Sequence, residues 1–477
     1  MNIFYFSIII STLLLKGHCV FPNFMDQDYN FLYSRLKNKE LFLDNIFGTP
    51  NLTTDKNITW LRPFEIVTNF TLYKDLISIR DIKQGQLGDC WFIAALANLL
   101  YDRDILWKVI PMEQTFKNYR GIFYFRFWLY GDWVNVVIDD RLPTFKDSNN
   151  KIQLLYANHS NGKFWVALLE KAFAKLFGSY DRIISGNTQE AMLSLMGGVT
   201  MSSNPTTERN ETQLYLERLS GKAFIITGSM DKNLTPKELN GIIPFHAYSV
   251  IDMVKMVYQN KKIVTLLKLR NPWGTGTEWN GDWSDSSHKW IDVSNTTKQK
   301  LNLQNNKDGE FWIDFQDFSK IFNDVTFGVV HPSNAFGSKY TYVWNEYKIN
   351  DNFLNLNNFS FDVKKESFIY VSLIQKFRRF NNKSDLLIDF VIYEKQKNIP
   401  IGKFEPPKNS PFQQSTNVAG FTILPVGMYY ILPRAVNKNI HDKFPCEGFS
   451  GCEYLLRIYI SSYFAEIWKN FVMKQFL

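Results

Sequence analysis

The chain has 477 residues, of which 45% are hydrophobic and 21% are charged, a balance that excludes a disordered chain, a coiled coil or a collagen-like fibre. Four cysteines are too few for a disulfide-built scaffold, and at roughly 150 residues per domain the length predicts about three folded units. The net charge of +8 is spread thinly along the chain. No segment has the concentrated basic stripe of a nucleic-acid groove, so we expect no nucleic-acid partner.

The first 20 residues contain an uncharged apolar run from Ile3 to Leu15, followed by Lys16. The run is shorter than the roughly 20 apolar residues of a membrane-spanning helix. It has the length of the hydrophobic region of a signal peptide, although no lysine or arginine precedes it. We therefore expect residues 1–20 to be a signal-peptide-like leader, with a buried N-terminal strand or helix as the alternative.

The segment from Asp81 to Leu100 combines a polar turn with an apolar run of helical spacing. Gly85 and Gly88 lie in the turn, and Cys90 begins the helical run. At a helix N-terminus the free N–H groups and the macrodipole favour an anion, which lowers the pKa of a thiol and makes it nucleophilic. The pattern predicts that Cys90 is a nucleophile, the alternative being an ordinary buried cysteine.

A cysteine nucleophile needs a general base and a group that orients the base. His246 begins the alternating run HAYSVI, and the next strand-like run leads to Asn271 in NPWG. The order Cys, His, Asn is that of papain-like proteases. In this arrangement the Asn271 side chain would accept a hydrogen bond from one imidazole N–H. Trp273 would shield that hydrogen bond from water. Gln84 would donate its amide to the oxyanion, beside the Cys90 backbone N–H.

The motifs GQLGDCW, FHAYSV, LRNPWG and DGEFW together resemble the calpain family of cysteine proteases, and the resemblance runs from about Gln27 to the mid-330s. It implies a role for each matching position: nucleophile Cys90, general base and acid His246, orienting group Asn271, oxyanion donor Gln84 and shielding residue Trp273. One departure adjoins the histidine, because Phe245 stands where the family usually has glycine. We expect the added bulk to narrow the cleft or restrict the residue next to the scissile bond, changing substrate preference more than activity.

The resemblance also implies two calcium sites in the protease core, and calcium prefers six to eight hard oxygen ligands. For the second subdomain the matching positions are the four carboxylates of Glu278, Asp285, Asp308 and Glu310, together with the backbone carbonyl of Asn306. All four carboxylates are present, so we expect this site to bind calcium. The alternative is an exposed hairpin turn at Asp308 and a surface acid at Glu278.

The calcium site of the first subdomain is altered. Asp81 is present, whereas Lys163 occupies the position of the partner glutamate. A protonated lysine cannot ligate calcium. We expect the Lys163 ammonium to take the place of the ion and pair with Asp81, which would make calcium dependence partial. The alternative is a dead site and low activity.

From about Gly337 the chain consists of short alternating runs separated by polar turns, a pattern that predicts an all-β sandwich. This part resembles, more loosely, the β-sandwich domain that follows the calpain protease core. The acidic loop of that domain has no counterpart, since residues 345–358 are rich in asparagine. Cys446 and Cys452 would form a small disulfide in a secreted protein, or remain two free thiols. No EF-hand loop occurs after Ser462, so no small EF-hand subunit is expected.

The predicted fold is α+β: a papain-like cysteine protease core in two subdomains, followed by an antiparallel β-sandwich. The expected boundaries are residues 1–20 for the leader, 21–187 for the subdomain with the cysteine, 188–336 for the subdomain with the histidine and asparagine, 337–462 for the sandwich, and 463–477 for a C-terminal tail.

The predicted function is calcium-dependent limited proteolysis of protein substrates by a Cys-His-Asn triad. The alternatives are a catalytically weak scaffold that binds partners through its sandwich, and a transglutaminase-like acyl transferase, against which the third residue, Asn271, argues because transglutaminases use aspartate. The resemblance implies a cytoplasmic protein, whereas a cleaved leader implies the secretory pathway or the extracellular space. Membrane association is left open, because no single segment favours it.

Overall fold

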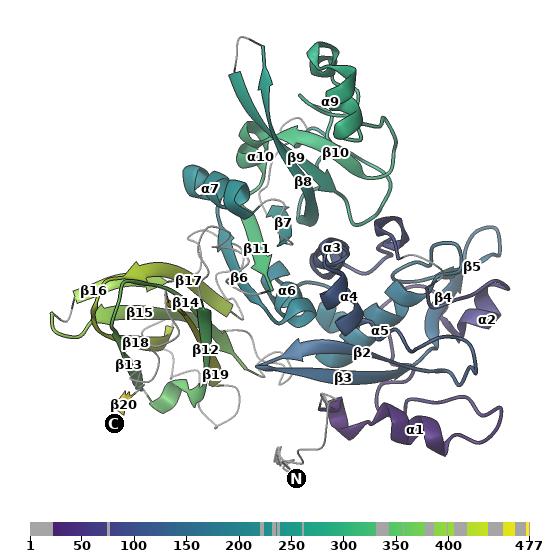
Figure 1. The fold of residues 1–477 in the computed structure, drawn as a ribbon. Coiled ribbons are helices and arrows are strands. Elements are labelled where there is room, and N and C mark those ends of the chain that lie inside the picture. The colour runs from purple at the N-terminus through teal and green to yellow at the C-terminus, as the bar shows by residue number, and fades with distance from the viewer. Residues whose placement is uncertain are drawn as a thin grey trace.

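The computed structural model describes residues 22–73, 77–219, 224–230, 235, 239–259, 262–330, 343–355, 357–376, 386–397, 399–404, 417–436, 452–462 and 474–476. Helices lie in the first two thirds of the chain, and strands form most of the last third (Figure 1). The named strands pair antiparallel throughout. An α+β core followed by a β domain is thus confirmed. The expected leader lies outside the described residues.

The N-terminal part of the core is built from helices and short strands. Its helices are α1 (Tyr29–Arg35), α2 (Pro63–Ile66), α3 (Cys90–Leu99), α4 (Arg103–Val109), α5 (Trp165–Phe177) and α6 (Thr188–Met196), with 3-10 turns at Phe24–Asp26, Ile79–Asp81 and Asp181–Ile183. Its strands are β1 (Thr59–Leu61), β2 (Ile122–Leu129), β3 (Asp132–Asp139), β4 (Leu142–Lys146) and β5 (Ile152–Leu154). The sheets are β1-β4-β5 and the hairpin β2-β3.

Helix α5 is buried over its whole length, including Glu170, Lys171 and Lys175. A helix that is covered on every side belongs to the interior of a domain, and charged side chains there require partners. Apolar residues of α3, α5, α6 and the β2-β3 hairpin join in one large cluster around it.

The second part of the core is a six-stranded sheet in the order β10-β9-β8-β7-β11-β6. Its strands are β6 (Val199–Ser203), β7 (Phe224–Met230), β8 (His246–Tyr258), β9 (Lys262–Arg270), β10 (Glu310–Asp314) and β11 (Asp324–Val329), and its helices are α7 (Arg209–Leu219), α9 (Asn295–Lys300) and α10 (Phe315–Ile321), with a 3-10 turn at His288–Asp292. A separate apolar cluster covers this sheet. Strands β8 and β9 form a long hairpin with a bulge between Val250 and Asp252.

Helix α3 joins the two parts. Its residues from Trp91 to Leu99 are all buried, and it lies between α6 and strands β7 and β8 (Figure 1). Two side chains bridge the contact: Asn98 Nδ2 donates to the Ile226 carbonyl at 2.9 Å, and Ser249 Oγ donates to the Ala94 carbonyl at 2.8 Å. Both bonds are buried, so losing either would leave polar groups unsatisfied.

The C-terminal part has two sheets, β12-β19-β14-β17 and β16-β15-β18-β13-β20. The strands are β12 (Val343–Asn352), β13 (Asn358–Val363), β14 (Ser367–Gln375), β15 (Leu387–Glu394), β16 (Ile399–Phe404), β17 (Asn417–Leu424), β18 (Gly427–Val436), β19 (Glu453–Ser462) and β20 (Lys474–Phe476), with a 3-10 turn at Phe353–Asn355. Alternate residues such as Ile369, Val371 and Leu373 point into one apolar cluster that both sheets share.

Cys452 is buried in that cluster and is disulfide-bonded. Position 446, the expected partner, lies outside the described residues. Within the part of the chain that the structure describes, no helix combines the length and apolar character needed to cross a bilayer.

The β domain contacts the six-stranded sheet through buried polar groups. Tyr370 Oη donates to the Thr200 carbonyl at 2.8 Å, and Asn417 Nδ2 donates to Thr200 Oγ1 at 2.9 Å. Arg457 donates to the Gly198 carbonyl at 2.5 Å, and its charge is balanced within the β domain by Glu346 at 2.7 Å. The domain is therefore held to the core by directional bonds as well as by apolar packing.

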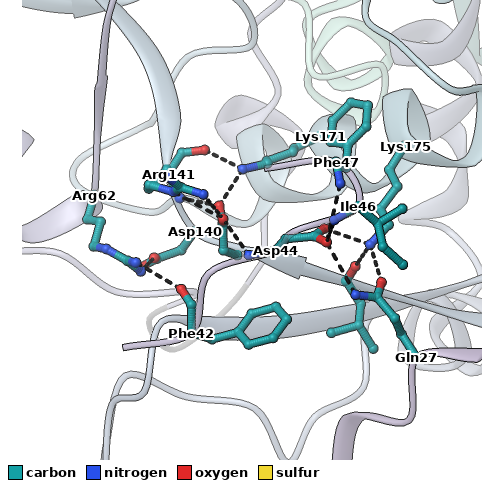
Figure 2. Close-up of polar contacts among 12 residues, drawn as sticks. Gln27, Phe42, Asp44, Ile46, Phe47, Arg62, Asp140, Arg141, Lys171 and Lys175 are labelled. Carbon is teal, nitrogen blue, oxygen red and sulfur yellow. Dashed lines mark hydrogen bonds and ion pairs between the residues drawn. The ribbon is translucent and has the colours of Figure 1, made fainter. Parts of the chain in front are cut away.

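The buried lysines of α5 bind the N-terminal segment to the core (Figure 2). Lys175 Nζ lies 2.6 Å from Asp44 Oδ2 and also donates to Gln27, so two otherwise irregular segments converge on one ammonium. Lys171 Nζ lies 2.6 Å from Asp139 Oδ1 and donates to the Arg141 carbonyl. Each charge is matched, which is the condition under which charges are tolerated in an interior.

We expect Lys175→Met to lower the free energy of unfolding by about 3–5 kcal/mol, because it leaves the Asp44 carboxylate buried without its cation. Urea denaturation measures the change. The matched control is Lys320→Met, which removes an exposed pair with Asp317 and should cost less than about 1 kcal/mol. Equal effects of the two substitutions would show that the buried pair does not anchor the N-terminal segment.

Candidate active site

Cys90 is the first residue of α3 and carries a free, half-buried thiol. The preceding turn passes so close to other backbone that a side chain would not fit. A Cβ at Gly85 would lie 1.9 Å from the Tyr156 carbonyl oxygen, and one at Gly88 would lie 2.6 Å from the Ile184 carbonyl oxygen. The two glycines therefore set the path by which the chain enters the helix and so position the sulfur.

His246 is the first residue of β8, and its imidazole is buried. Nε2 lies 2.9 Å from Asn271 Oδ1. The Trp273 backbone N–H donates to the same oxygen at 3.0 Å, which identifies that atom as the amide oxygen and makes Nε2 the protonated nitrogen. The second ring nitrogen, Nδ1, is then the basic one.

Two more contacts complete the surroundings of the histidine. The Trp273 ring centroid lies 5.1 Å from that of the imidazole, and the Trp273 side chain is 38% exposed. This position beside the imidazole supports the predicted shielding of the His246–Asn271 bond, which stays a prediction. Asn271 is itself held by its backbone N–H, which donates to the Gly309 carbonyl at 2.8 Å, and its side-chain Nδ2 is buried without a partner.

The thiol and the imidazole are brought together because α3 packs directly on β8. The backbone N–H of Ala247, the residue after His246, donates to the Cys90 sulfur. The structure thus gathers Cys90, His246, Asn271 and Trp273 in one place, although they come from three separate segments of the chain.

The charge state of the site differs from the sequence-based expectation. Burial raises the pKa of the Cys90 thiol to about 11, and the adjacent Asp89 contributes to the increase, whereas backbone N–H groups oppose it. The expected lowering by the helix N-terminus is therefore wrong for this state, because loss of water outweighs the helix terminus. Burial likewise lowers the pKa of His246 to about 4, although the bond to Asn271 opposes the change. Thiol and imidazole are both neutral near pH 7.

Gln84 lies near the cysteine but its amide is engaged elsewhere. Gln84 Nε2 donates to the Leu87 carbonyl at 2.7 Å, and Oε1 is buried without a hydrogen-bond partner. Its backbone N–H donates to the Pro272 carbonyl at 3.1 Å, which links this turn to the segment after Asn271. The side chain is close to the site, and its role as an oxyanion donor stays a prediction.

A pair of buried acids lies directly behind the cysteine, and the sequence analysis missed it. Asp89 and Glu170 are both almost fully buried and their side chains contact each other. The Gln84 amide and the Asp89 backbone N–H favour the charged form of Asp89, whereas the contact between the two acids becomes a hydrogen bond only when one of them keeps a proton. Burial raises the pKa of Asp89 to about 7, and burial together with Asp89 raises that of Glu170. The signal in the sequence was an acid inside the apolar run of α5.

The predicted ligands of the second calcium site lie around the start of β10. Burial raises the pKa of Asp285 to about 7, and the charges of Glu278 and Asp308 add to the increase. Asp285 Oδ2 is buried without a partner, and the Asn306 backbone N–H donates to this carboxylate. Crowded hard oxygens of this kind fit calcium in chemical type.

Two of the predicted calcium ligands, Glu310 and Glu278, are engaged in other contacts. Glu310 pairs with Lys268 at 2.7 Å, and Glu278 Oε1 accepts from the Gly309 N–H at 2.7 Å. Among the described residues, no three His, Cys, Asp or Glu side chains lie close enough to hold a metal ion. Glu278, Asp285 and Asp308 thus have the chemical type that calcium prefers but are not gathered around one point in this structure, and Glu310 would first have to leave Lys268.

The first calcium position does not fit an ion. Lys163 Nζ lies 3.0 Å from Asp81 Oδ1 and 3.1 Å from Oδ2, and the Asp81 side chain is 5% exposed. The ammonium thus occupies both carboxylate oxygens. The expected pairing of these two side chains is present in the structure.

The acid pair predicts a pH dependence of stability. Because the folded-state pKa of Asp89 lies above its ordinary value of 3.8, the folded protein binds more protons than the unfolded one between about pH 4 and 7, and stability falls as pH rises. Asp89→Asn removes this proton uptake, so wild type should lose stability relative to the variant by at most about 1.4 kcal/mol per pH unit. Urea denaturation at several pH values measures the difference. Asp28→Asn, at the N-cap of α1 where the carboxylate accepts from the Phe31 N–H, is the control, because it leaves the Asp89–Glu170 pair in place.

The chain is similar in sequence to several known proteins. Calpain-A of Drosophila melanogaster is 40% identical over 324 residues, covering 65% of this chain and 38% of that protein. Calpain clp-4 of Caenorhabditis elegans is 41% identical over 304 residues, covering 61% and 41%. The chain thus spans about two fifths of the length of these relatives. Calpain-5 of Mus musculus is 32% identical over 507 residues, covering 91% of this chain and 75% of that protein. Residues 25–328 match the calpain family cysteine protease domain, and the chain belongs to that family.

Proposed function

We propose that the chain is a calcium-dependent cysteine endopeptidase that performs limited proteolysis of protein substrates. One observation carries the proposal: the helix that begins with a free thiol packs on the strand that begins with His246, and His246 Nε2 is hydrogen-bonded to Asn271. The family membership implies cysteine peptidase chemistry, and this geometry supports Cys90, His246 and Asn271 as the residues that perform it.

In the proposed mechanism the neutral pair reacts in two stages. As Cys90 Sγ attacks the scissile carbonyl carbon, its proton passes to His246 Nδ1, an S–C bond forms and the carbonyl π electrons move to oxygen. When the tetrahedral intermediate collapses, the C–N bond breaks and the imidazolium protonates the leaving amine. Water then attacks the thioester, giving its proton to Nδ1, and the carboxyl product leaves with the regenerated thiol.

The neighbouring residues have supporting roles in this mechanism. Asn271 keeps Nε2 protonated and the ring oriented, so that Nδ1 is available to the sulfur. The Cys90 backbone N–H and a Gln84 amide rotated away from the Leu87 carbonyl would stabilise the oxyanion. Because thiol and imidazole are both neutral, the charge separated during attack must be stabilised by these groups and by the substrate itself.

We further propose that the core closes as two papain-like subdomains over a cleft for extended peptide. The two large apolar clusters, one around α5 and one on the six-stranded sheet, support this division. Extended segments of folded proteins suit such a cleft, because a strand-like backbone offers its N–H and C=O groups to both walls.

The carboxylates Glu278, Asp285 and Asp308, with the Asn306 carbonyl and a released Glu310, would hold calcium. Bound calcium would neutralise charges that now repel one another beside Asp285. These residues adjoin the segment from Asn271 to Trp273, since Asn271 bonds to Gly309, so ordering the first group orders the second. The Lys163–Asp81 pair supplies a permanent charge balance in the other half of the core, which makes calcium dependence partial.

The compartment is proposed from two opposing observations. Membership of the calpain family favours the cytoplasm, where calcium is scarce and can act as a signal. The apolar run from Ile3 to Leu15 and the disulfide-bonded Cys452 support the alternative, the secretory pathway, since disulfides persist in oxidising compartments.

Casein provides the direct test of the reaction. We expect wild type to cleave casein when calcium is added and Cys90→Ala to lose more than about a thousandfold in rate while unfolding at the same urea concentration, because only the nucleophile is removed. Incorporation of a labelled amine into casein without cleavage would instead indicate acyl transfer. Absence of both activities in a folded protein would leave a non-enzymatic scaffold.

The lysine at the first calcium position gives a second test. Lys163→Glu replaces the ammonium beside Asp81 by a carboxylate, so two acids face each other and bind calcium rather than each other. We expect the variant to need more calcium for activity than wild type, and its melting temperature to rise with calcium over a larger range. Lys320→Glu, at an exposed position, is the control. Identical calcium titrations of Lys163→Glu and wild type would refute a substitute role for the ammonium.

A further inference from the structure

Phe245, the residue before His246, has an unfavourable backbone conformation. Its φ is +53°, in the left-handed region that bulky side chains rarely adopt. Most of the other positive-φ positions in the described chain are asparagine or glycine, which tolerate that region. A phenylalanine at such a position costs folding free energy and is retained only where the surroundings or a function compensate.

Packing in the interior does not compensate for this conformation, because the Phe245 side chain is 63% exposed. The next residue, His246, is in contrast buried, and its ring lies against Trp273, which is also partly exposed. Two partly exposed aromatic residues therefore flank the same histidine, Trp273 through its ring contact and Phe245 as its neighbour in the chain. Exposed apolar area of this kind, next to a cluster of reactive groups, is the signature of a surface that is covered when a ligand binds.

The position of Phe245 relative to the reaction follows from chain geometry. Adjacent Cα atoms lie about 3.8 Å apart, so Phe245 is no further from the imidazole than one residue. In the proposed reaction the scissile bond lies beside the Cys90 sulfur and His246, so the substrate residues that flank it pass close to the segment that carries Phe245. A glycine here would relieve the backbone but offer no contact.

We propose that Phe245 is a specificity-determining residue: its ring, together with Trp273, forms an apolar surface that selects an apolar or aromatic substrate side chain next to the scissile bond. The inference rests on the proposed proteolysis. It deepens that proposal by naming a substrate class, extended peptides with a leucine-like or phenylalanine-like side chain beside the cleavage point. The backbone conformation is held because it directs the ring toward bound peptide, not for stability.

The test compares Phe245→Gly, Phe245→Leu and wild type, as full-length proteins with calcium, on a peptide library in which the residues flanking the cleavage point vary. We expect Phe245→Gly to lose on the order of tenfold in the ratio of kcat/KM for apolar against small flanking residues. Phe245→Leu, which keeps apolar bulk, should retain most of that ratio. An unchanged ratio in Phe245→Gly would overturn the proposal.

Lys39→Gly is the matched control for the backbone, because Lys39 is exposed, has φ +66° and lies in the turn after α1. Both glycine variants should raise the melting temperature, and only Phe245→Gly should change the cleavage profile. A change of profile in Lys39→Gly as well would assign the effect to general stability and overturn the proposal.

A binding measurement separates this inference from the proposed reaction. The measurement uses Cys90→Ala, a variant that does not cleave its peptide. Adding Phe245→Gly to this variant should weaken its binding of a leucine-containing peptide about tenfold and leave its affinity for a glycine-containing peptide nearly unchanged. If wild type cleaves nothing but this difference in binding appears, the proteolysis proposal fails and the recognition surface stands. If wild type cleaves but neither peptide binding nor the cleavage profile depends on Phe245, the recognition surface is refuted and the proteolysis proposal stands.

Discussion

The packing of helix α3 against strands β7 and β8 is the contact on which the candidate site depends. It places a helix N-terminus beside the first residue of a strand, and so brings Cys90 next to His246. The helix is short and wholly buried, and its alanines allow the backbone to approach the sheet closely. Two buried side-chain bonds fix its register, since they accept only one alignment of helix and strand. A shift of one residue would break both bonds and turn the thiol away from the histidine.

The helix that packs behind the candidate site buries several charged side chains. Helix α5, which packs behind the site, carries Glu170, Lys171 and Lys175 in its interior. The two lysines are balanced by Asp139 and Asp44, and these pairs hold the N-terminal segments in place. Glu170 instead meets Asp89, another acid, and the two side chains form a hydrogen bond when one of them holds a proton. The residue next to the nucleophile is thereby held neutral in the folded protein over part of the pH range, which limits the negative charge beside the sulfur.

The carboxylate charges at the two predicted calcium positions, near Asp81 and near Asp285, are balanced in different ways. Near Asp81 the ammonium group of Lys163 balances the carboxylate charge permanently. Near Asp285 the charges of Glu278 and Asp308 add to the rise in the pKa of Asp285, and Glu310 is paired with Lys268. A site that crowds unpaired acids favours a cation from solution, whereas a site with its own ammonium excludes one. This asymmetry supports the proposal that one half of the core responds to calcium and the other does not.

The amino-acid sequence by itself determined the α+β core, the β domain, the helix that begins at Cys90 and the strand that begins at His246, because periodicity and turn glycines are local properties. It also led to the Lys163–Asp81 pair, through the resemblance to a family. Only the tertiary structure decided the charge states: burial at Cys90 outweighs the helix terminus, and the degree of burial depends on segments far apart in the chain. The tertiary structure also decided the Asp89–Glu170 contact and the left-handed backbone of the exposed Phe245. A local sequence pattern predicts neither a contact between distant segments nor a single backbone angle.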